Sequence, residues 1–162
     1  MKKLLLATAL LSTGAMANVP IMGTVESKCV ITTETPGIYG NPTPNKLSSL
    51  EADGGITPVV RFDVATADYY KAVITTPDTF TTSPALADVV NWSGDVSVSE
   101  VTVAEMAAYD TNKRVYNNTH EFDLTIAGTV WFKATSTAEY GYDKSFPAGN
   151  YNAVVEATCI AI

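Results

Sequence analysis

The stretch HEFDLTIAGTVWFKAT, residues 120–135, has the clearest strand pattern in the chain. Apolar side chains occupy every second position on one side of it, and acidic or hydroxyl side chains occupy much of the other. This period of two is typical of a β-strand with one buried face. Gly128 interrupts the pattern, which predicts a bulge or a close backbone approach there. The apolar set is Phe122, Leu124, Ile126, Val130 and Phe132, and the opposite set begins with Glu121, Asp123 and Thr125.

Shorter segments of the same kind lie on both sides of this stretch. Glycine and proline separate them, as they do between strands. About six or seven strands with long connections predict an all-β protein, an antiparallel sandwich of immunoglobulin-like type. The pattern over 101–110 fits either a strand or one or two helical turns. The other predicted strands are 59–65, 69–75, 89–99 and 151–159, with a long irregular connection over 35–58.

The first 17 residues have the organisation of a secretory signal peptide. Lys2 and Lys3 precede an apolar run over 4–11, and Ala15-Met16-Ala17 resembles a signal-peptidase site. Cleavage after residue 17 leaves 145 of the 162 residues, enough for one domain with its own core. No later apolar run has the length to span a bilayer. We therefore expect an exported protein without membrane insertion, with residues 29–162 as its folded domain.

The predicted mature chain is acidic. Removing Lys2 and Lys3 lowers the basic count from 10 to 8 against 17 acidic residues, a formal net charge of −9. Nucleic acids and anionic lipids attract positively charged proteins, so neither is an expected partner. The acidic residues are scattered, which is typical of a solvated surface.

Signals of catalysis are sparse. His120 is the one histidine, and we expect it at the surface or at a strand edge because no nucleophile motif accompanies it. Two distant cysteines and one histidine do not have the spacing of a zinc site. The sequence therefore predicts neither an enzyme nor a metal site, and no cofactor.

Cys29 and Cys159 are the only cysteines in the chain. In an exported protein an even count favours a disulfide, which here would join the start of the mature chain to its end. In the chain-entropy description such a bridge stabilises the fold by about 4–5 kcal/mol. An intermolecular bridge and two free thiols are the alternatives.

The segment NVPIMGTVESK, residues 18–28, directly follows the predicted cleavage site. Val19, Ile21 and Val25 lie on one parity with Gly23 between them, so an extended segment would have one apolar face. A strand at a chain terminus frays unless something holds it. The groove that holds this one belongs either to its own domain or to a neighbouring molecule.

Four stretches together resemble the major subunits of chaperone–usher pili, most closely those of the alternate, or α-fimbrial, class. They occur in the same order and span nearly the whole mature chain. The resemblance implies a sandwich that lacks its last strand. A periplasmic chaperone first supplies that strand, and at the outer-membrane usher the N-terminal segment of the next subunit replaces it. The four stretches are 19–25, EADGGITP at 51–58 with the strands that follow, NWSGDVSVSEVTVAEMAAYD at 91–110, and FPAGNYNAVVEA at 146–157.

The resemblance implies a role for each end of the mature chain. Residues 18–28 would be the donor-strand segment, and the final strand would line the acceptor groove. The expected partners are identical or related pilin subunits, the chaperone and the usher. The expected location is the periplasm in transit and then a cell-surface fimbrium that supports adhesion. The donor residues would be Val19, Ile21, Gly23 and Val25, and the groove residues Tyr151, Ala153, Val155 and Ala157.

The cysteine pair departs from this family, whose members generally lack it. A donor strand between the first and last strands would hold them about 9–10 Å apart, more than a disulfide tolerates between Cα atoms. A Cys29–Cys159 bridge must then lie beyond the end of the donor strand, or the groove must close at that point. The alternative function is a self-complete secreted binding module that folds 18–28 into its own groove and is clipped by this disulfide. An enzyme is the third possibility.

Overall fold

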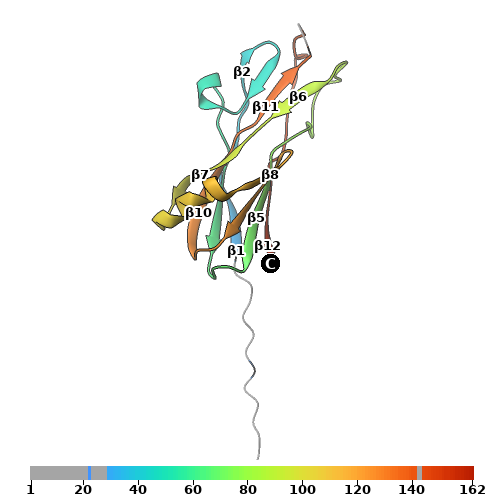
Figure 1. Cartoon of the computed structure of the whole chain (residues 1–162). Helices are drawn as coiled ribbons and strands as arrows, with labels where there is room; N and C mark the ends of the chain where they lie inside the picture. Colours follow the sequence, from blue (N-terminus) through green and yellow to red (C-terminus); the bar gives the residue numbers. More distant parts are fainter. Residues whose placement is uncertain (1–21, 23–28, 142–143) are drawn as a thin grey trace, which may run out of the picture.

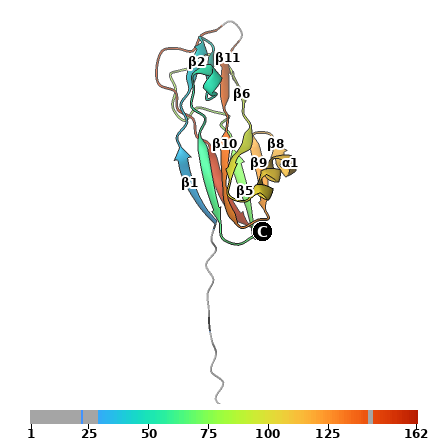
Figure 2. The ribbon, with the colours of Figure 1, turned by 90° about the vertical axis from the view of Figure 1, so that its left-hand side faces the viewer.

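Twelve strands build three antiparallel sheets of four strands each in the described part of the chain. The computed structural model describes residue 22 and residues 29–141 and 144–162 (Figure 1). Two of the sheets form a sandwich, and the third lies at one end of it, opposite the end that holds the C-terminus (Figures 1 and 2). No helix in these residues is long and apolar enough to cross a membrane.

The two sheets of the sandwich each have one central pair of strands and two edges. The first has the order β1 (Cys29–Thr35), β4 (Val59–Val64), β10 (Gly128–Ala134) and β7 (Val96–Val101). The second has the order β12 (Glu156–Ala161), β5 (Tyr70–Thr75), β9 (Thr119–Leu124) and β8 (Arg114–Tyr116). The prediction of an all-β antiparallel sandwich is confirmed.

Three phenylalanines occupy the centre of the core, and each is at most 1% exposed. The ring centroid of Phe132 lies 4.4 Å from the ring centroid of Phe122 on the facing sheet. It lies 5.5 Å from the ring centroid of Phe62 on its own sheet. The alternation of the strands brings the rest of the core to the same layer. It includes Val60, Val64, Tyr70, Ala72, Ile74, Val96, Leu124, Val130 and Ala134.

The stretch 120–135 forms two strands rather than the continuous one that its pattern predicts. β9 ends at Leu124 and β10 begins at Gly128, and the two strands belong to different sheets. Gly128 has φ +149°, which favours glycine, and a Cβ there would lie 2.8 Å from the side chain of Met106. The sequence predicts a close approach at Gly128, and one exists, but the group that approaches the glycine is the side chain of Met106 rather than another backbone.

The third sheet lies where the sequence predicts an irregular connection, so that prediction is wrong for residues 40–48. It has the order β2 (Gly40–Thr43), β3 (Lys46–Ser48), β11 (Thr137–Tyr140) and β6 (Val90–Ser93). The predicted strand 89–99 likewise divides into β6 and β7, in separate sheets. The ambiguous stretch 101–110 leaves β7 and enters helical turns, η2 (Ala104–Ala108) and α1 (Tyr109–Asn112). A further turn, η1 (Glu51–Asp53), follows β3.

The strand order matches an immunoglobulin sandwich up to its last strand. That fold has A-B-E-D in one sheet and G-F-C in the other. β1-β4-β10-β7 corresponds to A-B-E-D, and β12-β5 corresponds to F-C, with β9 and β8 beyond it. Among the described residues no strand pairs with the outer edge of β12, where G would lie. The sandwich is therefore open along one side.

The aromatic core predicts a large effect of truncating Phe132. We expect Phe132→Ala to lower the free energy of unfolding by about 3–5 kcal/mol, because it leaves a cavity between the two sheets. Val115 on β8 is 50% exposed, and Val115→Ala should change stability by less than about 0.5 kcal/mol. Urea denaturation of the oxidised proteins measures both, and equal losses would contradict this account of the core.

Candidate functional site

Two strand edges face one another along the open side of the sandwich, and neither has a partner among the described residues. Within these residues, β1 pairs only with β4 and β12 pairs only with β5. We call the space between them the seam, bounded by residues 29–39 on one side and 149–161 on the other. Such edges carry backbone N–H and C=O groups that another strand can pair with.

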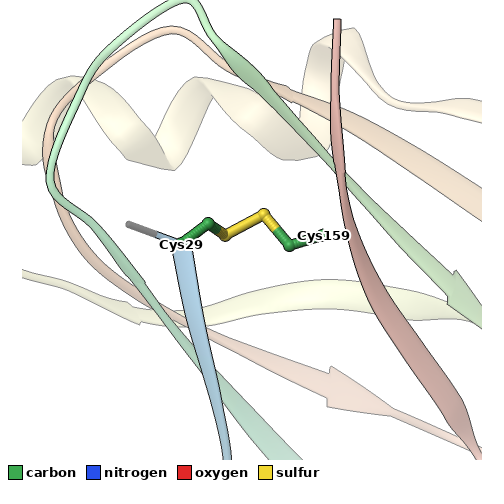
Figure 3. The surroundings of a disulfide bond; sticks show 2 residues. All are labelled: Cys29 and Cys159. Atoms are coloured by element: carbon green, nitrogen blue, oxygen red, sulfur yellow. A yellow bond between two sulfur atoms is a disulfide. The ribbon is translucent and has the colours of Figure 1, made fainter. Parts of the chain in front are cut away.

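A disulfide between Cys29 and Cys159 closes one end of the seam (Figure 3). The two Cα atoms are 6.3 Å apart. Cys29 opens β1 opposite Val64, and Cys159 lies within β12 opposite Ala72, so both cysteines belong to ladders. The predicted intramolecular bridge is confirmed, and the groove closes at its level.

The edge strands along the seam are less buried than the central strands. The inward side chains of the central strands are buried, as Phe62 and Ile74 illustrate at 0% exposure. Inward positions on the edges, such as Ile31 and Val155, are only half-buried. Thr33 has the same parity as Ile31 and is exposed. The core therefore lacks a full cover along the seam.

The seam widens into an open cleft of about 610 Å³ at the end near the third sheet. One wall includes Thr33, Thr35 and Tyr39, and the opposite wall is residues 149–155. None of the lining residues carries an ionisable acid or base other than its two tyrosines. Burial raises the pKa of both Tyr39 and Tyr151, so these phenols stay neutral. The cleft is an uncharged surface of apolar, hydroxyl and amide groups.

Three of the four predicted groove residues line this cleft: Tyr151, Ala153 and Val155. The fourth, Ala157, lies in β12 nearer the bridge, half-buried against the core. The last strand begins at Glu156 and not at Tyr151 as its pattern predicts. The four predicted donor residues, Val19, Ile21, Gly23 and Val25, lie outside the described residues.

The backbone beside the cleft is free to pair. Asn152 forms an isolated bridge with Thr82, and the ladder to β5 starts at Glu156. Between them, residues 153–155 make no backbone hydrogen bond to any described residue. This wall therefore offers unpaired N–H and C=O groups next to apolar side chains.

An aromatic cluster that the sequence reasoning missed supports the cleft. The ring of Phe80 lies 5.1 Å from that of Tyr151 and 6.4 Å from that of Tyr39. Trp92 and Phe146 pack on Phe80 from other sides, at 4.6 and 6.0 Å. The Tyr39 hydroxyl also lies 2.8 Å from the Ser136 hydroxyl.

His120 is buried, so the expectation of a surface or edge position is wrong. It is 2% exposed, and its Nε2 lies 3.2 Å from Oδ1 of Asp95. Nζ of Lys113 lies 2.8 Å from the same carboxylate oxygen. His120 Nδ1 has no hydrogen-bond partner among the described residues. Burial lowers the pKa of His120, although the Asp95 carboxylate opposes this.

Within the described ranges, no group of three or more acidic, histidine or cysteine side chains gathers as metal ligands do. Comparison of the chain with protein families, with curated proteins and with solved structures gives no match. The seam and its cleft are thus the features on which a functional argument rests.

The buried histidine predicts a loss of stability in weak acid. Because the pKa of His120 is lower in the folded chain than its ordinary value of 6.5, the unfolded chain takes up the proton first as pH falls. We expect the free energy of unfolding to decrease between pH 7 and pH 5, and His120→Gln to flatten that decrease. Urea denaturation at pH 7, 6 and 5 measures it. The same slope in both proteins would contradict the assignment.

Proposed function

We propose that this chain is a structural subunit of a surface pilus, assembled by donor-strand exchange with a periplasmic chaperone and an outer-membrane usher. The observation that carries the proposal is the seam, an uncovered side of an otherwise well-packed sandwich between two unpaired strand edges. A strand added there gains main-chain hydrogen bonds from the edges and side-chain contacts from the core. The resemblance to α-fimbrial subunits supports the same function.

The N-terminal segment has the chemistry that the cleft would accept. Residues 18–25, NVPIMGTV, contain no charged side chain, and the residues that follow are Glu26, Ser27 and Lys28. The cleft is likewise uncharged at neutral pH. The seven residues 19–25 would extend over about 23 Å as a strand, and the wall 149–155 also has seven residues. Length and polarity both favour this occupant.

The two features that would meet in an assembly lie at opposite ends of the sandwich. Residue 28 is bonded to Cys29 at the bridged end of the seam, whereas the cleft is lined in part by Leu47 of β3 and so lies toward the third sheet. A segment from one molecule that fills the cleft of the next produces a head-to-tail contact. Contacts of this kind do not close on themselves unless the rotation forms a ring, so they generate filaments.

A self-complete secreted binding module is the second candidate. The intramolecular bridge favours it, because a disulfide stabilises a domain that works alone. The position of Cys29 is against it, since the seam is narrowest where the chain's own segment would have to enter.

The donor role of residues 18–25 is testable by deletion and by a matched pair of substitutions. Deleting 18–25 should abolish polymers and leave a chaperone-dependent subunit that still folds. Ile21→Asp should weaken assembly more than about 100-fold, because a buried unpaired charge costs about 3–5 kcal/mol. Met22→Asp, on the opposite parity, should assemble. Electron microscopy and size-exclusion chromatography report the polymers, and normal polymers after the deletion would refute the proposal.

The acceptor role of the cleft is testable on its opposite wall. Ala153→Asp places a carboxylate in the uncharged cleft and should prevent a second molecule from pairing there. Thr158 is exposed on the outer face of β12, so Thr158→Asp is the control and should polymerise normally. Both monomers should unfold at similar urea concentrations. Polymerisation by Ala153→Asp at the normal rate would exclude the cleft as the acceptor.

A further inference from the structure

We infer that the Cys29–Cys159 bridge is an end stop of the seam, which keeps the chain's own N-terminal segment out and admits a segment of a second copy from the cleft end. The inference rests on the proposed function and concerns how the same site selects its occupant.

The seam is too narrow at the bridge to admit a strand. A strand that lies between two others needs about 9–10 Å between them. The Cα atoms of Cys29 and Cys159 are 6.3 Å apart, so no strand passes between the two edges at this level. Both cysteines are also paired in their ladders, Cys29 with Val64 and Cys159 with Ala72. Widening the seam there would break the covalent bond or disrupt two sheets.

The seam opens some distance away from the bridge. Away from the bridge, residue numbers rise along β1 and fall along β12. Ile31 therefore lies at the level of Ala157, and Thr33 lies at the level of Val155. Ile31, Ala157 and Val155 all pack against the core, but of the two levels only that of Thr33 and Val155 lines the cleft. The opening therefore starts about four residues from the bridge, roughly 13 Å along the strand.

The chain's own N-terminal segment is attached at the closed end of the seam. Residue 28 is bonded to Cys29, so the segment would have to leave that residue as the next strand beside β1. Its first pairing positions would then fall between Cys29 and Cys159, in the closed part of the seam. A segment from a second copy enters at the opposite end and meets no such barrier, because residues 149–155 border an open cleft.

In a polymerising subunit, the chain's own N-terminal segment would compete with that of a neighbour for the seam. A segment tethered by a short linker has an effective concentration in the millimolar range. At about 10 μM of protein, the chain's own segment would outcompete that of a neighbour by about 100-fold if both could enter. The end stop removes this competitor, so that open-ended assembly becomes possible.

Photocrosslinking from the tip of the segment tests the inference. The probe is p-benzoylphenylalanine in place of Asn18, on the parity opposite to Val19 and Ile21, in the full mature chain at about 10 μM. The bridged chain is compared with Cys29→Ser/Cys159→Ser and with the folded wild-type chain reduced by dithiothreitol. The reduced sample serves if the double variant does not fold. Denaturing gels separate crosslinks between chains from those within a chain, and mass spectrometry locates them.

For the bridged chain we expect a ladder of crosslinked multimers, with the crosslinks near Thr33 and Val155 of the second chain. Without the bridge, crosslinks within one chain should dominate and the ladder should weaken at least about tenfold. Phe122→Leu loosens the core but keeps the bridge, so its ladder should match that of the wild type.

Two results would overturn the inference while the proposed function survives: an equal ladder with and without the bridge, or crosslinks into the seam of the same chain when the bridge is intact. If the probe reaches no seam residue in any sample, the segment does not occupy the seam. The proposed function and the inference then fail together.

Discussion

The covalent tie between two unpaired strand edges is the constraint on which the rest of the structure depends. In the described part of the chain, β1 and β12 are each held by a single ladder, and the bridge joins them at one end. The open side of the sandwich is therefore a wedge, closed at Cys29 and wide beside Tyr151. A bridge across 130 residues also restricts the unfolded chain, worth about 5 kcal/mol in the chain-entropy description. That contribution helps to offset apolar surface that the seam leaves uncovered.

The same surface is a hazard and a means of association. Unpaired strand edges beside apolar side chains promote aggregation unless something covers them. The phenylalanine core is covered although the seam is open, since Phe62, Phe122 and Phe132 are each at most 1% exposed. The net negative charge of the chain, −7, adds repulsion between molecules.

The sequence predicts the strand faces well because both sheets point at one core. Leu124, Ile126 and Val130 keep one parity through the turn between β9 and β10, so the alternation cannot reveal that the chain changes sheet. The third sheet was missed because its strands have three or four residues, and β2 contains a proline. His120 shares the parity of Phe122, which is the signal for its burial. Cysteine counting indicates a bridge, but only the fold places it at one end of a groove.

The placement of Cys29 also determines how tension would travel through a head-to-tail assembly. A pull on residues 18–28 reaches the domain at Cys29, the residue that carries the disulfide. The force would then divide between the β1–β4 ladder and a covalent route into β12, which borders the cleft. Part of the load would bypass the phenylalanine core. In the proposed fibre, the bridge would be a mechanical link between successive joints.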